Sequence, residues 1–69
     1  MRILLIEDDA VLRGVMHASL TDAGHRVDEA PTLADARTLW LVQQFDAVLH
    51  FVVHLLHSRL TLTPRQAPS

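Results

Sequence analysis

The sequence has 69 residues, no cysteine and a formal net charge of −2 at pH 7. This length allows one small domain, and the absence of cysteine excludes a disulfide framework and a thiolate metal site. The mild charge argues against nucleic-acid and membrane binding, and the apolar run Ile3–Ile6 is too short for a signal peptide. We therefore expect a soluble, cytoplasmic protein.

Charge and composition change abruptly near His50. Residues 1–49 contain eight acids and four arginines, whereas residues 50–69 contain two arginines and no acid. This change predicts two segments, a folded domain over 1–49 and a divergent apolar, histidine-containing tail over 50–69. From about residue 61 the tail carries two prolines, which favours a disordered end.

The first predicted element is a buried strand over Arg2–Ile6, since four consecutive aliphatic residues are typical of a strand covered on both faces. Glu7, Asp8 and Asp9 follow directly. They lie at the carboxyl end of the strand, where ligands bind in open α/β sheets. Clustered carboxylates repel each other, so a hard cation such as Mg²⁺ is one expected partner. The alternative is the start of a helix with solvated acids.

The remaining pattern predicts a helix over Ala10–Ala23, an edge strand over His25–Ala30, a helix over Leu33–Gln44 and a strand starting with Phe45–Leu49. We expect Asp9 to cap the first helix and Gly24 to end it. Thr32 and Asp35 resemble a capping box for the second helix, and Trp40 on that helix is expected to pack on the sheet. The order β-α-β-α-β with short connections predicts an α/β fold with a parallel sheet.

Residues 1–49 resemble the first half of a response-regulator receiver domain of a two-component system, in the subfamily of transcription factors with a winged-helix DNA-binding domain. The resemblance rests on Ile3–Asp9, on Ala23–Val27 and on Phe45–Leu49. It implies a partial flavodoxin-like fold with three parallel strands in the order 2-1-3. It also implies a phosphorelay in which a sensor histidine kinase is the partner and transcription is regulated.

In the family, an acid pair after the first strand binds Mg²⁺, and this pair corresponds to Glu7 and Asp8. An aspartate at the end of the third strand accepts the phosphoryl group, but Phe51 stands at that position, preceded by His50. No acid follows Asp46 and the chain contains no lysine. The resemblance therefore implies a receiver-like protein that binds Mg²⁺ weakly, has no catalytic residue, is no enzyme and is not phosphorylated.

The family's fourth and fifth strands have no counterpart in the sequence, so we expect a truncated receiver joined to an unrelated tail, as a frameshift or splice would produce. Three strands alone would leave the third as an open apolar edge. The sequence thus predicts one of two outcomes. Either the tail folds back over that edge as a helix or strand, or the chain self-associates through its third strand.

Two further functions stay open. The first is an interaction module that binds a kinase through the first helix and the loops beside it, or binds itself, without phosphorelay activity. The second is a metal-binding fragment, because His50, His54 and His57 follow the spacing i, i+4, i+7 that shares one face of a helix. Direct DNA binding is not expected, since the sequence has no basic patch and no recognition helix.

Overall fold

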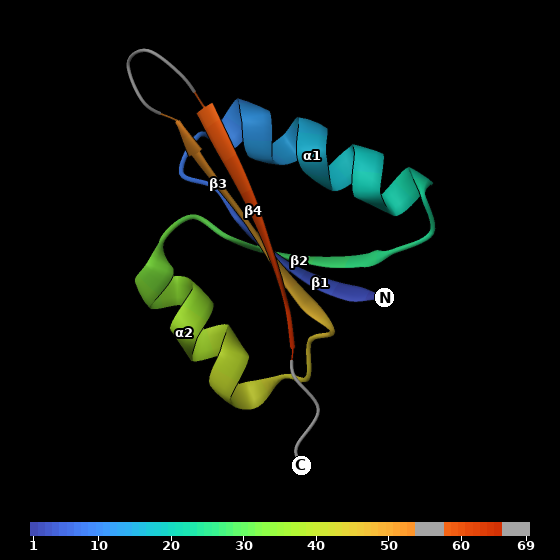
Figure 1. Ribbon diagram of the computed structural model, residues 1–69, viewed down its shortest axis with the longest axis vertical. Helices are drawn as coiled ribbons and strands as arrows, with labels where there is room; N and C mark the ends of the chain where they lie inside the picture. The colour runs from blue at the N-terminus through green and yellow to red at the C-terminus, as the bar shows by residue number, and fades with distance from the viewer. Residues whose placement is uncertain (54–57, 66–69) are drawn as a thin grey trace.

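A computed structural model describes residues 1–53 and 58–65 of the chain. Within these residues the chain forms one four-stranded sheet and two helices (Figure 1). The elements are β1 (Arg2–Ile6), α1 (Ala10–Asp22), β2 (Arg26–Ala30), α2 (Leu33–Val42), β3 (Ala47–Val53) and β4 (Ser58–Pro64). The fold is α/β, and the first five elements lie where the sequence predicts them, with ends that differ mostly by a residue or two.

The sheet has the order β2-β1-β3-β4 and is mixed. β1 runs parallel to both of its neighbours, and Ile3 pairs with Val27 of β2 on one side and with Ala47 of β3 on the other. β4 runs antiparallel to β3, with His50 opposite Thr61. The predicted strands in the order 2-1-3 are present and parallel, but the prediction that the sheet consists of these three strands is wrong, because a fourth strand of opposite direction completes it.

The tail supplies this fourth strand. β3 continues to Val53, beyond the expected segment boundary at residue 49, and Thr61–Pro64 belong to β4 instead of a disordered end. The physical reason is that β3 would otherwise expose a row of unpaired backbone groups, which an antiparallel neighbour satisfies. Of the two predicted outcomes, the structure has the fold-back as a strand. β3 is consequently not an edge open for self-association, since β4 pairs along it.

The two helices cover opposite faces of the sheet, because alternate residues of β1 point to opposite sides. Leu4 and Ile6 pack with α2, whose Ala36, Leu39 and Trp40 join the same cluster; this confirms that Trp40 packs on the sheet. Ile3 and Leu5 form the other cluster with α1. Its further members are Met16, Leu20, Val27 and Leu49. β1 is thus the centre of both cores.

The predicted helix ends are confirmed by hydrogen bonds. The side chain of Asp9 accepts from the amide of Leu12 at 2.8 Å and caps α1, and Thr32 accepts from the amide of Asp35 at 3.1 Å and caps α2. Gly24 has a φ of 93°, a conformation that glycine adopts without steric cost, and it turns the chain from α1 towards β2. After this turn at Gly24, β2 runs parallel to β1 and beside it.

The end of β4 is held near α2 by a group of aromatic and arginine side chains. The guanidinium of Arg65 lies 4.1 Å from the centre of the Trp40 ring, and Trp40 stacks with Phe45 at 6.1 Å. Arg2 approaches the ring of Phe45 at 5.2 Å. The amide of Arg65 also donates to the carbonyl oxygen of Asp46 at 3.0 Å. These contacts fix where β4 ends.

Candidate functional site

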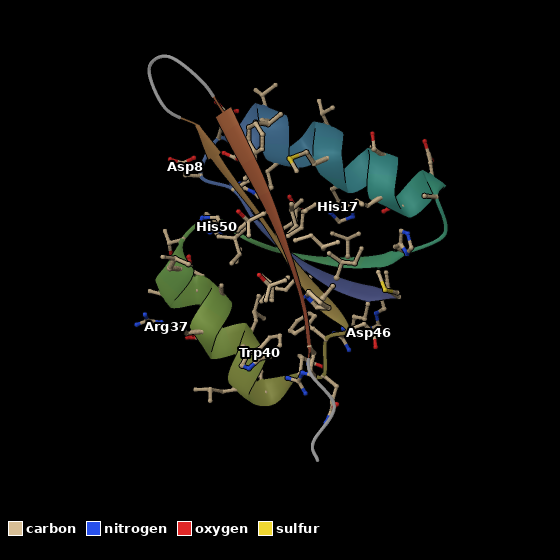
Figure 2. The ribbon with its side chains drawn as sticks, in the orientation of Figure 1. Asp8, His17, Arg37, Trp40, Asp46 and His50 are labelled. Atoms are coloured by element: carbon tan, nitrogen blue, oxygen red, sulfur yellow. The ribbon has the colours of Figure 1, made fainter. Side chains whose placement is uncertain are left out.

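Three consecutive carboxylates follow β1 at the carboxyl edge of the parallel strands. Glu7 is 1% exposed, whereas Asp8 and Asp9 are exposed. Figure 2 shows Asp8 and His50 at the same end of the sheet and Asp46 at the other. Glu7 and Asp8, which the sequence predicts as a ligand-binding pair, thus lie at the carboxyl edge of β1 as one buried and one exposed carboxylate.

The carboxylate of Glu7 is only partly satisfied. Its Oε1 atom accepts a hydrogen bond from the amide of Asp9 at 3.0 Å, while Oε2 is buried and has no hydrogen-bond partner among the described residues. Burial raises the pKa of Glu7 above its ordinary value, and the side chains of Asp8 and Asp9 add to the rise, against a smaller lowering by the amide of Asp9. The protonated form of Glu7 is thus favoured more than in a solvent-exposed glutamate.

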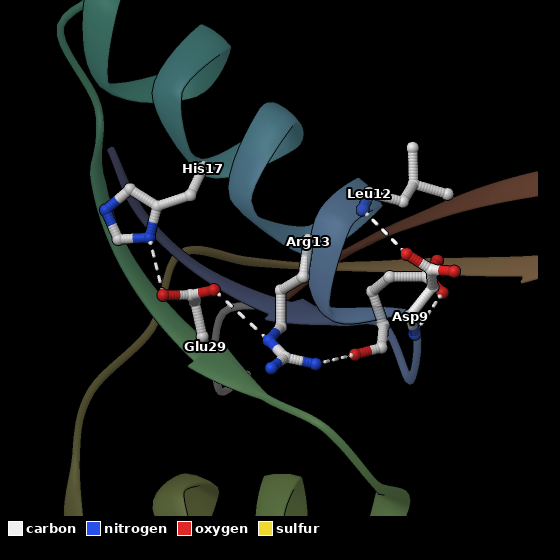
Figure 3. A network of polar contacts seen from close by, with 6 residues as sticks. Asp9, Leu12, Arg13, His17 and Glu29 are labelled. Carbon is white, nitrogen blue, oxygen red and sulfur yellow. Dashed lines mark hydrogen bonds and ion pairs between the residues drawn. The ribbon is translucent and has the colours of Figure 1, made fainter.

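The nearest arginine does not supply that positive charge to the carboxylate. Arg13 of α1 donates to the backbone carbonyl oxygen of Glu7 at 2.7 Å, and its Nε lies 3.2 Å from Oε1 of Glu29 on β2. The other oxygen of Glu29 lies 3.0 Å from Nδ1 of His17 (Figure 3). This network ties α1 to β2 and to the end of β1. It orients the loop, and among the described residues no side chain forms an ion pair with the Glu7 carboxylate.

Phe51, which stands where the resemblance to receivers would place a phosphoacceptor, lies on the neighbouring strand. β1 and β3 pair with Ile6 beside His50, so Phe51 follows at the level of Glu7. Phe51 is half-buried and brings no oxygen to this edge. Phosphoryl acceptance requires a nucleophilic oxygen or nitrogen, which a phenyl ring lacks.

Two cavities flank Asp8. One of about 410 Å³ is lined by Glu7, Asp8, Asp9 and Leu12. The other, of about 330 Å³, is lined by Ile6, Asp8, Pro31, Thr32, Leu33, His50 and Phe51. Over residues 1–53 and 58–65, no group of three or more acidic, histidine or cysteine side chains converges as metal ligands do. The carboxylates that line the larger cavity are those of Glu7, Asp8 and Asp9, and Oδ1 of Asp9 accepts from the amide of Leu12.

The histidine trio is not assembled by the described residues. His50 lies in β3, where it pairs with Thr61, and it contributes to the cavity beside Asp8. His54 and His57 lie outside the described residues. The helical face on which the metal-ligand spacing relied is absent at His50, because this residue belongs to a strand.

Sequence reasoning did not single out the Pro31–Thr32 segment as part of this edge. The signal was available, since both residues follow β2 at the same carboxyl edge at which β1 and β3 end. Asp46, by contrast, lies at the opposite end of the sheet, where its Oδ2 accepts from the amide of Arg2 at 2.7 Å. It is thus remote from Glu7 and Asp8.

No protein-family profile, curated protein or solved structure matches the chain. Among the described residues, neither helix has the length and apolar character required to cross a lipid bilayer.

Proposed function

We propose that the chain is a receiver-like signalling protein of a two-component phosphorelay that accepts no phosphoryl group. The observation that carries this proposal is the edge where β1 and β3 end together: the acid pair Glu7 and Asp8 follows β1, and Phe51 lies at the level of Glu7 on β3. A pair of acids beside a third, phosphorylated carboxylate is the arrangement that receivers use. Here the third carboxylate is replaced by an apolar ring, which removes the acceptor and keeps the acid pair.

The finer fold assignment, a flavodoxin-like arrangement as in receivers, belongs to the same proposal. The parallel strands in the order β2-β1-β3 support it, because this order creates a switch point between β1 and β3 at the carboxyl edge. Helices on opposite faces of β1 support it as well. β4 lies outside the receiver pattern, since its direction is antiparallel.

Mg²⁺ is the cation that this edge suits. The buried Oε2 of Glu7 has no hydrogen-bond partner among the described residues, and Asp8 offers an exposed carboxylate next to it, so the donor set is oxygen only. Glu7 and Asp8 would hold the ion, which would supply positive charge to a partner's phosphoryl group. With two carboxylates, most coordination positions fall to water, and binding is expected to be weak.

The partner implied is the histidine domain of a sensor kinase, bound through α1. Val11 and Val15 of α1 are exposed, Val15 at 58%, although both are apolar. Exposed apolar residues on one helix favour contact with another helical surface. Receivers contact their kinases through this helix and the acidic loops. We therefore expect α1 to bind the kinase, while Phe51 leaves no acceptor for its phosphoryl group.

Phosphorylation is tested with a small phosphodonor, acetyl phosphate, in the presence of Mg²⁺. We expect no mass gain for the native chain and an acid-stable, base-labile gain of one phosphoryl group for Phe51→Asp. Phe51→Asn serves as the matched control, since it is polar but not nucleophilic. A phosphorylated native chain would contradict the proposal.

Kinase binding is tested separately, by titrating the chain onto the isolated histidine domains of sensor kinases from the same genome. Val15→Arg should weaken binding at least tenfold, whereas Leu41→Arg on α2, which is 83% exposed, should leave it unchanged. Equal affinity of the two variants would remove α1 from the interface. Absence of binding to every histidine domain would remove the kinase partner.

A further inference from the structure

The sheet has two edge strands, β2 and β4, and they differ in how they are protected. β2 has five residues, of which Arg26, Asp28 and Glu29 are charged; Asp28 is paired with Arg2 at 2.7 Å, and Glu29 with Arg13. β4 has seven residues and a single charged one, Arg59. Charges on an edge discourage pairing with another chain. The charged side chains of β2 thus protect this edge against pairing with another chain. We call β4 the open edge, because it carries a single charge.

Backbone hydrogen bonds determine which groups of β4 face outwards. The amide of Arg65 donates to the carbonyl oxygen of Asp46, which directs the backbone groups of Arg65 towards β3. Because these groups alternate sides along a strand, those of Thr63 and Thr61 also face β3, and those of Leu62 and Leu60 face away from it. The register of β3 with β4 agrees, since Thr61 lies opposite His50. The outward side of β4 therefore offers donors and acceptors at Leu60 and Leu62.

Pro64 also lies on the outward-facing set, where its missing N–H costs no bond to β3. Because Pro64 has no N–H to donate to another chain, the stretch of β4 that can pair fully with such a chain runs from Ser58 to Thr63. Thr61, Leu62 and Thr63 are exposed, Leu62 at 56%. The stretch is uncharged at these three residues and carries a large exposed aliphatic side chain, both of which favour strand pairing.

We propose that a second copy of this chain pairs antiparallel along β4, about a two-fold axis that passes beside Thr61. In this register Leu60 of one copy lies opposite Leu62 of the other, and both residues have outward-facing backbone groups, so they exchange hydrogen bonds in both directions. Ser58 lies opposite Pro64, which accepts through its carbonyl oxygen. Two four-stranded sheets become one continuous sheet.

A second copy is favoured as the occupant because antiparallel pairing of one strand with itself is self-complementary and closes after two subunits. The sequence Leu60-Thr61-Leu62 reads the same in both directions, so the two-fold register repeats it without mismatch. Head-to-tail growth would need β2 as the acceptor, and its paired charges oppose this. One edge strand buries less than a standard interface of about 1,600 Å², so we expect a weak, concentration-dependent dimer.

Sedimentation equilibrium of the full chain tests the association. The weight-average mass of the native 7.7 kDa chain should rise with concentration and clearly exceed that of the monomer at about 1 mM, as expected for a dissociation constant of about 1 mM. Leu62→Lys should raise the dissociation constant at least tenfold, and Leu41→Lys, at an exposed leucine of α2, should not change it. A native chain that stays monomeric to about 1 mM, or a dimer equally stable in Leu62→Lys, overturns the proposal.

Cross-linking tests the register. The chain has no cysteine, so Thr61→Cys carries a single thiol. Across the two-fold axis Thr61 forms a non-hydrogen-bonded pair with itself, in which the Cα atoms lie about 4.5 Å apart, within disulfide range. Oxidation should join Thr61→Cys chains rapidly and Thr38→Cys chains, with the thiol on exposed α2, slowly. Equal rates would overturn the two-fold pairing even if the chain associates by another surface.

Discussion

The β2–β1 half of the sheet packs against a helix on each face, whereas the β3–β4 half meets the two helix-facing clusters only through β3, by Val48 on one face and Leu49 on the other. The first half buries most of the core, including Leu4, Leu5 and Ala30. The second half is held mainly by strand pairing and by contacts at its ends. The antiparallel strand satisfies the backbone of β3, whose Ala47 and Leu49 are buried while Val48, His50 and Phe51 are only half-buried. We call the two parts the covered half (β1, β2, α1, α2) and the bare half (β3, β4).

The difference also separates the candidate functions. The acid pair of the receiver-like proposal lies on the covered half, where Glu7 is buried and accepts a hydrogen bond from the amide of Asp9, whereas Phe51 lies on β3 of the bare half. The open edge that supports self-association lies on the bare half, at Leu62 and Thr63. Matched substitutions in the two halves should therefore alter one function without altering the other.

The largest expected effect comes from the same substitution made in each half. Leu5→Ala removes a fully buried side chain from the α1 face of β1 and should cost about 2–5 kcal/mol. A domain of this size has about 3–5 kcal/mol of stability, so this variant should be largely unfolded at 25 °C. Leu62→Ala, at a residue that is 56% exposed, should cost less than about 1 kcal/mol.

Urea denaturation followed by circular dichroism measures the free energy of unfolding of both variants. The protein concentration is kept low enough that any dimer dissociates. Similar losses for the two variants would mean that the bare half is as well packed as the covered half. That result would contradict the comparison.

The second prediction concerns pH and the buried acid of the covered half. The pKa of Glu7 is raised above its ordinary value of 4.5 by burial and by the neighbouring acids. Between 4.5 and the raised value, the folded chain holds a proton that the unfolded chain has lost, so the free energy of unfolding falls as pH rises through this interval. Glu7→Gln should remove this fall and be more stable than the native chain at neutral pH.

Chemical denaturation at several pH values between 4 and 8, without divalent cations, measures this slope. Asp22→Asn, at the exposed end of α1, is the matched control and should keep the native pH dependence. Addition of Mg²⁺ at neutral pH should stabilise the native chain and not Glu7→Gln, because only the native chain can offer both carboxylates. A Glu7→Gln variant that is less stable than the native chain at neutral pH would contradict the assignment of Glu7 as a destabilised acid.

The third prediction concerns the start of α1, which positions the acidic loop. Asp9→Ala removes the side chain that accepts from the amide of Leu12 and should cost about 1 kcal/mol. Asp22→Ala, at the other end of the same helix, should be neutral or slightly stabilising, because a negative charge near the carboxyl end of a helix is unfavourable. Thermal denaturation followed at 222 nm compares the two, and equal losses would mean that the cap contributes nothing.

How far the sequence predicts this structure differs between the halves for physical reasons. In the covered half the signals are local: the four aliphatics of β1, the caps Asp9 and Thr32, and Gly24 after α1 each specify their own element. In the bare half, the alternation of Leu60 to Thr63 marks a strand, but Pro64 and Pro68 favour a disordered end over the same residues. Pairing with β3 is a long-range interaction that a local pattern does not specify.

The candidate site shows the same limit. Three adjacent acids look alike in the sequence, and only the direction of β1 and the packing of α1 decide that Glu7 is buried while Asp8 and Asp9 are exposed. The acidic edge itself was predictable, because the residues that follow a buried strand lie at its carboxyl end. The contact of Arg65 with Trp40 was not, since it joins the tail to α2 across a distance in sequence that no motif records.

The smallest expected effect tests the link between the halves. Arg65→Ala removes the guanidinium that lies 4.1 Å from the ring of Trp40, together with its weak contact to Gln44 at 3.4 Å. At an exposed site a cation–π contact contributes about 0.5–1 kcal/mol. The backbone bond to Asp46 survives this change, so β4 should stay paired and fray only at its end. Arg65→Lys keeps the charge and should lose less than Arg65→Ala.

Native-state hydrogen exchange resolves this prediction by residue. In Arg65→Ala the amide of Thr63 should lose protection, because it lies in the part of β4 next to the lost contact, and the amides of β1 should keep theirs. Loss of protection in β1 to the same extent would mean that the two halves unfold as one cooperative unit. The bare half would then depend on the covered half for its stability. In that case Arg65 would contribute to the stability of the whole sheet and not only to the pairing of β4.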